Sequence, residues 1–307
     1  MNNLSDSLIT RLSRMLLTLA MAYLAVCFST AADSGEVDRP VVTEPRALSW
    51  RDEGQTIWVN GPDGRQKVRA YPGAQLSDNP VLVLWIHGDL DPGAEPYELA
   101  QQVAHVATNV VVVALIRPGY SDADGDTSAG LKGYGVGDNY TAQVVDDVHA
   151  VIQALKNRFH ARAVIVLGHS GGAGITADLL GRHPEDTDAA VLIACSCDPK
   201  GFMVRWIADH PGAAPKGLPN TSLSPLDLAR SVSLRAHVRM VIGSSDTVVL
   251  VSPSQAYARA LKSRGVDVRV TVVPNAGHVD VLKTAAVKQA VTDVVALEGG
   301  AIRAPPK

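Results

Sequence analysis

Cysteine, aromatic side chains and net charge are all scarce in this chain. Its 307 residues include three cysteines, 5% aromatic residues and a formal net charge of −3. Without a basic excess there is no positive stripe for a phosphate backbone, so we expect no nucleic-acid partner. The sequence also lacks a Cys-X-X-Cys pair, a His-Glu-X-X-His helix and a His/Cys cluster, so it indicates no metal site and no cofactor.

Apolar residues, by contrast, are plentiful, since 46% of the chain is hydrophobic and 19% is charged. A chain of this length can bury one large core, because single α/β domains commonly reach this size. We therefore expect one domain at residues 47–300, preceded by a flexible, proline-rich linker at residues 33–46. The sequence contains no internal repeat, and it leaves the oligomeric state open.

The first 32 residues resemble a secretory signal peptide. Arg11 and Arg14 precede an apolar run over residues 15–28, and small residues follow as far as Ala32. This order predicts cleavage near Ala32 and a secreted or periplasmic protein with no stable membrane span afterwards. The apolar run is shorter than the roughly 20 residues that a membrane-spanning helix needs, although an uncleaved anchor remains an alternative.

The three cysteines say little about the compartment. Cys27 lies in the leader, and residues 24–27 resemble a bacterial lipid-attachment site except that Val26 stands where a small residue is expected. Lipidation is therefore a minor alternative. Cys195 and Cys197 lie two positions apart at an expected strand end. Side chains at this spacing in an extended segment point to opposite faces, so a disulfide would be strained and we expect two buried thiols.

Signals for strands and helices alternate along the rest of the chain. A hairpin is expected at residues 56–59 and 68–71, because Gly61-Pro62-Asp63-Gly64 favours a turn between them. The further expected strands are short apolar runs at residues 81–85, 109–115, 163–167, 189–194, 237–242 and 266–273. The expected helices lie at residues 97–106, 141–159, 172–182 and 279–297, with one more that Ser252 caps, Pro253 begins and Gly265 ends.

This alternation predicts an α/β fold with a mostly parallel central sheet, an antiparallel N-terminal hairpin and helices on both faces. Residues 198–234 interrupt the pattern and are too few for a second core, so we interpret them as a short lid insertion. A helix-like apolar grouping within this segment favours either a lid over a mid-sized apolar pocket or core packing; it consists of Phe202, Met203, Trp206 and Ile207.

The strongest chemical signal is Gly168-His169-Ser170-Gly171-Gly172, which directly follows an expected strand and opens an expected helix. It fits the G-x-S-x-G elbow, in which a sharp turn holds the serine in a strained conformation and needs small neighbours two positions away. Ser170 is therefore the candidate nucleophile. The free N–H groups at the helix start, that of Gly171 above all, are suited to stabilise an oxyanion.

Two further motifs follow earlier expected strands. His87-Gly88-Asp89 comes after the strand at residues 81–85, and Arg117-Pro118-Gly119-Tyr120 comes after the next strand. With the serine elbow, these motifs resemble the α/β-hydrolase superfamily across nearly the whole mature chain, with a C-terminal part similar to esterases, lactone hydrolases and prolyl-oligopeptidase-like enzymes. The resemblance implies that the N–H of Asp89 completes the oxyanion hole, although a simple tight turn at Gly88 is the alternative.

Asp89 is a departure that weakens this assignment, since a carboxylate beside a developing anion repels it unless it is turned away or neutralised. A glycine-rich stretch at residues 133–137 has no strand before it and no Gly-Lys-Ser/Thr after it, so we interpret it as a loop rather than a phosphate site. Three tyrosines near these loops are candidates either for pocket lining or for packing, namely Tyr120, Tyr134 and Tyr140.

A serine nucleophile needs a base, and the base needs a carboxylate that holds its tautomer. Among nine histidines, only His278 lies in a short loop after the last expected strand, where the superfamily places its base. Asp246 follows the strand at residues 237–242 and is the expected acid. Asp198, after the preceding strand, is the competitor, because some members of the superfamily use that position.

These residues predict a serine hydrolase that cleaves a carboxylic ester or related acyl bond of a small molecule through an acyl-enzyme. A peptidase, an amide hydrolase and an acyltransferase share the same residues and remain alternatives. A non-catalytic binding protein on the same fold is the alternative of another class, because fold does not fix function.

Overall fold

The computed structural model of the chain describes residues 54–90, 92–133, 137, 139–209 and 221–302. The expected leader and linker lie outside the described residues, as do Tyr134 and most of the glycine-rich stretch, and nothing is described of the Trp206 side chain. No helix in the described part of the chain combines the length and the hydropathy that a membrane crossing requires. Because the leader lies outside the described residues, the expected secretion of the protein stays a prediction.

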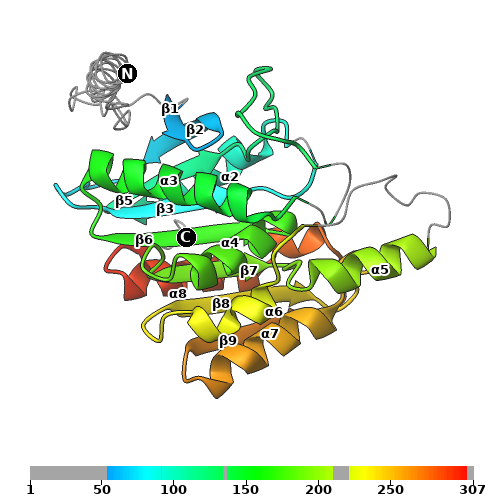
Figure 1. The fold of residues 1–307 in the computed structure, drawn as a ribbon. Coiled ribbons are helices and arrows are strands. Elements are labelled where there is room, and N and C mark those ends of the chain that lie inside the picture. Colours follow the sequence, from blue (N-terminus) through cyan, green and yellow to red (C-terminus); the bar gives the residue numbers. More distant parts are fainter. Residues whose placement is uncertain (1–53, 91, 134–136, 138, 210–220, 303–307) are drawn as a thin grey trace, which may run out of the picture. The chain divides into compact units, whose positions relative to one another are not determined.

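Eight strands form the central sheet, in the order β1-β2-β5-β3-β6-β7-β8-β9 (Figure 1). The first two strands are antiparallel to their neighbours, and all later pairs are parallel, as expected. The strands are β1 (Gln55–Gly61), β2 (Gly64–Pro72), β3 (Val81–Ile86), β5 (Val110–Leu115), β6 (Ala163–His169), β7 (Ala189–Ile193), β8 (His237–Gly243) and β9 (Asp267–Val273).

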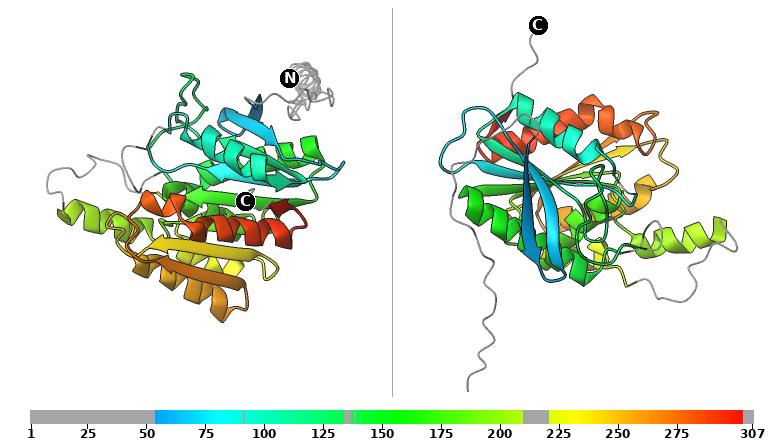
Figure 2. Two further views of the ribbon diagram at one scale, coloured as in Figure 1. Left: turned by 180° about the vertical axis from the view of Figure 1, so that it is seen from behind. Right: turned by 90° about the horizontal axis from the view of Figure 1, so that it is seen from above.

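Helices cover both faces of this sheet (Figure 2). One face packs against α2 (Glu95–Val106) and α8 (Ala285–Leu297). The other face packs against α3 (Ala142–Phe159), α4 (Gly171–Arg182) and α7 (Val251–Ser263). The segment expected to form a lid, residues 198–234, contributes α5 (Pro199–Asp209), the single turn α6 (Pro225–Leu228) and a 3₁₀ turn at Ala229–Ser231. These layers are those of the α/β-hydrolase fold.

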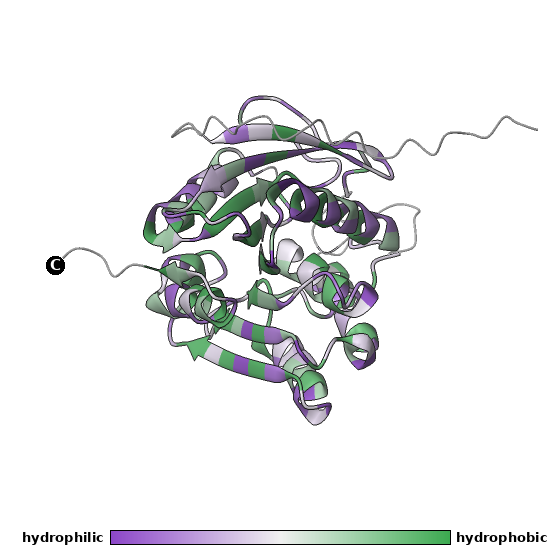
Figure 3. Cartoon of the chain, turned by 90° about the vertical axis from the view of Figure 1, so that its left-hand side faces the viewer, coloured by the Kyte–Doolittle hydropathy of each residue, from purple (hydrophilic) through white to green (hydrophobic). Residues whose placement is uncertain are grey.

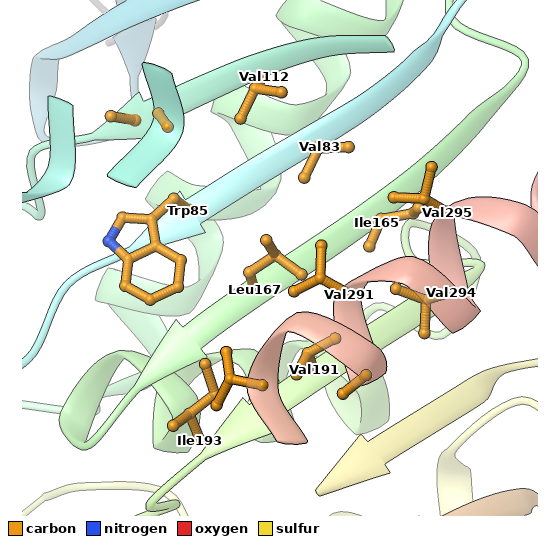
Figure 4. Close-up of a cluster of buried hydrophobic side chains, with 14 of the residues drawn as sticks. Val83, Trp85, Val112, Ile165, Leu167, Val191, Ile193, Val291, Val294 and Val295 are labelled. Atoms are coloured by element: carbon orange, nitrogen blue, oxygen red, sulfur yellow. The ribbon is translucent and has the colours of Figure 1, made fainter. Parts of the chain in front are cut away.

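Alternation of side chains along the strands builds a core on each face. In β3, Val83 and Trp85 belong to the cluster under α2 and α8, whereas Leu82 and Leu84 belong to the cluster under α3. Figure 4 shows the first cluster, in which side chains of β6 and β7 lie against Val291 of α8. Because both faces are buried, the central strands are continuously apolar, and they appear green in Figure 3.

Two helix ends follow from local chemistry. The Thr141 side chain accepts a hydrogen bond from the N–H of Val144 and so caps α3, which begins one residue after this threonine. Gly265 has φ +92° just beyond α7, in the left-handed region expected there. The expected cap of α7 is wrong, however. Ser252 lies inside the helix, and Leu250 occupies the N-cap position without a side-chain hydrogen bond.

Two other expectations of secondary structure also need correction. The last helix does not run without a break from residue 279, because Thr284 is extended (ψ 154°) and separates a 3₁₀ turn, Asp280–Lys283, from α8. A two-stranded ladder was not expected; it joins β4 (Ala107–Thr108) to β10 (Ala301–Ile302). The chain after α8 thus returns to pair with a segment far away in sequence.

The two cysteines after β7 form a disulfide rather than two thiols. The Cys195 and Cys197 sulfurs are 2.05 Å apart, and the Cα atoms are 5.1 Å apart. The expectation of free thiols assumed an extended segment. The chain instead turns sharply here, because Ala194 has φ +45° and the N–H of Cys197 donates to the Cys195 carbonyl at 2.8 Å. This turn brings both side chains to the same side.

Candidate active site

Four loops meet at the edge of the sheet where the parallel strands end. They follow β3, β6, β8 and β9, which lie close together in the strand order. Ligands of open α/β sheets bind at this carboxyl edge. These loops, with the start of α4, carry the expected nucleophile, base, acid and oxyanion donors, whereas the competing acid Asp198 follows β7.

Ser170 stands at the turn between β6 and α4 with φ +54° and ψ −118°, a strained conformation for a residue with a side chain. Close backbone contacts exclude any residue larger than glycine at the positions two before and two after Ser170. A Cβ on Gly168 would lie 2.5 Å from the Gly172 carbonyl oxygen, and a Cβ on Gly172 would lie 2.2 Å from that of Ile86. The sequence Gly-His-Ser-Gly-Gly therefore folds into the expected elbow.

The structure brings Ser170, His278 and Asp246 into one hydrogen-bonded chain. Ser170 Oγ lies 2.9 Å from His278 Nε2, and His278 Nδ1 lies 2.8 Å from Asp246 Oδ2. An ionised carboxylate only accepts hydrogen bonds, so Nδ1 carries the proton and Nε2 accepts from the Ser170 hydroxyl. All three residues come from different loops more than 30 positions apart.

The second oxygen of Asp246 fixes the carboxylate in place. Asp246 Oδ1 accepts hydrogen bonds from the N–H groups of Val248 and Val249, both at 2.9 Å. The Asp246 side chain is fully buried, while the His278 side chain is partly exposed. Its competitor Asp198 does not take part in this chain, since its Oδ1 accepts from the N–H of Gly201 at the start of α5.

Asp89 is buried next to the elbow, and its carboxylate is neutralised. One oxygen accepts from Arg117 Nη1 at 2.9 Å, and the other accepts from the Tyr140 hydroxyl at 2.6 Å and the N–H of Gly137 at 2.8 Å. Burial opposes the charge of Arg117, but Asp89 nevertheless holds the pKa of the guanidinium above its usual value. The repulsion expected from a free carboxylate at this position is thereby removed.

Gly171 opens α4, where the first N–H groups of a helix have no partner within the helix. No described side chain caps this end of α4. A Cβ at Gly171 would lie 1.9 Å from Asp89 Oδ1, so the carboxylate lies against the glycine backbone and no larger residue fits. The two expected oxyanion donors, the N–H groups of Gly171 and Asp89, thus belong to adjoining segments.

His169 also contacts the hydrogen-bonded chain, from the position before Ser170. Its Nε2 lies 3.0 Å from the His278 carbonyl oxygen, and because a carbonyl only accepts, Nε2 carries the proton. Burial lowers the pKa of the His169 imidazole to about 4, which keeps this ring neutral beside His278. His169 therefore holds the backbone of the His278 loop without adding a second positive charge.

An open pocket of about 220 Å³ lies between the disulfide, α5 and the start of α7. It begins beside the elbow, because the N–H of Ser196, one of its lining residues, donates to the Ser170 carbonyl at 3.3 Å. Asp198, Phe202 and Arg205 line its other side. The expected lid segment thus contributes one wall of a pocket next to Ser170.

Comparison with protein families decides where the chain belongs. The model of the family described as serine aminopeptidase, S33, matches residues 81–239, which is just over half of the chain. The chain belongs to this family. A sequence comparison with curated proteins finds no match.

Solved structures agree with the α/β-hydrolase fold of this family. The esterase Pf2001 of Pyrococcus furiosus superposes with a TM-score of 0.58 at 18% identity, covering 82% of this chain and 96% of its own. Est1E of Butyrivibrio proteoclasticus, solved with ferulic acid, gives a TM-score of 0.58 at 15% identity and coverages of 79% and 98%. An acylaminoacyl peptidase gives a TM-score of 0.60 at 14% identity, covering 83% of this chain and 42% of the peptidase.

Three residues of this S33 family member make contacts in the site that the sequence does not predict. Arg117 and Tyr140 surround the Asp89 carboxylate, and His169 binds the His278 carbonyl. Arg117 stands in the motif that carried the resemblance, but its complete burial left no trace in the sequence. Tyr120 and Tyr140 are both buried, and Tyr140 binds Asp89 instead of lining an open pocket wall.

Proposed function

We propose that this S33 family member is a serine hydrolase that cleaves a carboxylic ester or related acyl bond of a small molecule through an acyl-enzyme on Ser170. One observation carries the proposal. The Ser170 hydroxyl, the His278 imidazole and the Asp246 carboxylate form a continuous hydrogen-bonded chain at the carboxyl edge of the sheet. This arrangement can activate a serine, and the elbow holds that serine at the edge of the sheet where substrates of this fold bind.

In the proposed reaction, His278 Nε2 takes the hydroxyl proton as Ser170 Oγ attacks the acyl carbonyl. Asp246 keeps His278 in the required tautomer and stabilises the imidazolium that forms. The N–H groups of Gly171 and Asp89 donate to the oxyanion of the tetrahedral intermediate. His278 then protonates the leaving alcohol, and a water molecule that His278 deprotonates releases the acid and restores Ser170.

The neutralised carboxylate of Asp89 supports this oxyanion hole. Arg117 and Tyr140 both bind the carboxylate, so its negative charge is balanced close to the position where the oxyanion develops. Arg117 is fully buried, and its charge therefore acts in a medium of low dielectric constant. Because the Asp89 and Arg117 charges cancel, the pair does not weaken the attraction between the N–H donors and the oxyanion.

Cleavage of an aminoacyl amide is the second candidate, and the family description favours it. An aminopeptidase needs a carboxylate that can bind the free α-ammonium group of its substrate. Neither buried carboxylate beside Ser170 is free for this, since Asp246 is bound by His278 and Asp89 by Arg117. Among the described residues that line the pocket, Asp198 is the carboxylate that remains for it.

Ester hydrolysis and aminoacyl amide cleavage predict different effects of the substitution Asp198→Asn. If the pocket binds an α-ammonium group, this variant should lower turnover of aminoacyl p-nitroanilides relative to p-nitrophenyl esters by about 10–100-fold, the value of a charged hydrogen bond. An ester hydrolase without an ammonium site should show the same ratio as the unmodified chain. Measurement of both substrates for both proteins separates the alternatives.

Hydrolysis itself is tested by comparing the unmodified chain with Ser170→Ala on p-nitrophenyl acetate. We expect turnover by the former and a loss of at least about 10³-fold in the variant, because only residual oxyanion stabilisation remains. Ser263→Ala, an exposed serine of α7, is the matched control and should retain full turnover. No turnover above background by the unmodified chain would favour a binding protein, and equal turnover by both proteins would contradict the role of Ser170.

A further inference from the structure

A second cluster of side chains lies at the opposite edge of the sheet from Ser170. His149 projects from α3, His183 ends α4, and Asp186 lies in the turn before β7. The potential ligand atoms of these three residues all lie within 4.8 Å of one another. Folding brings the histidines together although 34 positions separate them, which explains why the sequence showed no cluster.

The side chains of the cluster contact one another, and solvent reaches its two histidines. His149 Nδ1 is hydrogen-bonded to Asp186 Oδ2, and the two imidazole rings are stacked with centroids 4.0 Å apart. The Asp186 side chain is fully buried, whereas the His149 and His183 side chains are 32% and 19% exposed. An ion can therefore enter from solvent and reach a carboxylate at the base of the cluster.

Hydrogen bonds from residues around the cluster orient its side chains. Gln153 Nε2 donates to Asp186 Oδ1 at 2.6 Å, which leaves Oδ2 directed to the histidines. Asp146 Oδ1 lies 2.8 Å from His183 Nε2 and is also held by Arg182. A carboxylate that accepts the second ring N–H of a histidine is the usual partner of a metal-binding imidazole.

We propose that His149, His183 and Asp186 bind a transition-metal ion of the zinc type, with water completing its coordination. Two imidazoles and one carboxylate are ligands that Zn²⁺ and its neighbours prefer over Mg²⁺ or Ca²⁺. Tetrahedral coordination at about 2.0–2.1 Å keeps ligand atoms roughly 3.3 Å apart. The ion replaces the hydrogen bond between His149 and Asp186, and the two groups separate slightly to admit it.

The charge balance also favours a cation here. Asp146 and Asp186 contact the two histidines and Arg182 binds Asp146, so these three side chains together carry one net negative charge. A contrasting cluster, Asp122, Asp124 and Asp126, already contains its cation, because Lys67 Nζ binds all three carboxylates. Of the two such clusters among the described residues, the histidine cluster is thus the one whose proposed ligands are not bound by a lysine.

The proposed ion would join α3, the end of α4 and the turn before β7. Because α4 begins at the Ser170 elbow and ends at this cluster, the ion acts on stability at a distance from the catalytic chemistry. A ligand that binds the folded state alone raises the temperature of unfolding with its concentration. The test can therefore use binding and stability without any measurement of activity.

The experiment titrates tag-free, EDTA-treated protein with Zn²⁺ by calorimetry and follows Co²⁺ by its visible absorption. We expect one ion per chain, a higher temperature of unfolding with Zn²⁺ but not with Mg²⁺, and Co²⁺ bands typical of nitrogen and oxygen ligands. His149→Gln and His183→Gln should each weaken binding at least about tenfold. Circular dichroism in EDTA checks that each variant is folded.

Two controls locate the ion. His237→Gln alters another surface His-Asp pair, in which Nδ1 lies 2.9 Å from Asp267 Oδ2 without a second imidazole, and it should bind Zn²⁺ as before. His278→Gln should also leave binding unchanged. No binding, equal binding by the unmodified chain and both cluster variants, or binding that only His278→Gln abolishes would each overturn the proposal.

Discussion

The proton held on His278 Nδ1 depends on one carboxylate, and Asp246→Asn tests that dependence. The amide can present an N–H to Nδ1, which would move the imidazole proton to Nε2 and remove the acceptor for the Ser170 hydroxyl. We expect kcat for p-nitrophenyl acetate to fall about 10⁴-fold with little change in KM. A fall of less than tenfold would contradict the role of Asp246, and the exposed Asp280→Asn is the matched control.

The ion pair between Asp89 and Arg117, next to the proposed oxyanion hole, gives a second prediction at the residue scale. Asp89→Asn leaves the Arg117 guanidinium buried without its carboxylate, so we expect the free energy of unfolding to fall by about 3–5 kcal/mol. Urea denaturation measures this change. The double variant Asp89→Asn/Arg117→Met removes the unpaired charge and should recover part of the loss. Unchanged stability of the single variant would show that the pair has no structural role.

At the scale of elements, Asp147 connects α3 to the β1–β2 turn. Its Oδ1 accepts from the N–H of Asp63 at 3.1 Å, and its Oδ2 is buried without a partner among the described residues. Burial raises the pKa of the Asp147 carboxyl to about 6. Because the folded state then binds a proton more tightly than the unfolded chain, this group lowers stability as the pH rises from about 4 through 6.

Asp147→Asn should therefore stabilise the fold at high pH only. The amide keeps an acceptor for Asp63 and carries no charge, so we expect a gain of about 1–2 kcal/mol at pH 8, allowing for solvent screening near the turn. At pH 4 the gain should be much smaller. Thermal unfolding across this range measures it, with the exposed Asp78→Asn as control. A gain independent of pH would contradict the raised pKa.

Element types and their order were predictable because each parallel strand is an apolar run between helical patterns. The elbow at Ser170 was predictable for the same reason, since the strand that ends there and the glycines around it are local features. The β4–β10 ladder was not predictable, because it pairs Thr108 with Ala301. The disulfide was missed because its turn depends on the positive φ of Ala194, which the sequence does not indicate.

The site followed from sequence to the extent that position in the fold determines it. Ser170, His278 and Asp246 were each placed by the strand that precedes them, and the shared edge of the sheet brings them together. The burial of Arg117 and the hydrogen bond from His169 depend on packing between distant segments. Such contacts have no local signature, which is why these residues received no role.

At the scale of the whole molecule, the number of reactive thiols per chain tests both the disulfide and the removal of the leader. Protein purified without reductant and then denatured should show no reactive thiol if the leader has been removed, and one per chain if Cys27 is retained. Two further thiols should appear after reduction. A disulfide is expected to persist in an oxidising compartment, in accord with the predicted secretion. Reactive Cys195 and Cys197 in the unreduced protein would contradict the pairing.

The central claim is that Ser170 is the nucleophile, and covalent labelling tests it most directly. A fluorophosphonate reacts with a serine only where a base and an oxyanion hole activate it. Peptide mass spectrometry of the labelled chain should find one adduct, on Ser170, which His278→Gln greatly slows. A folded protein that stays unlabelled, or that carries the adduct on another serine, would contradict the account.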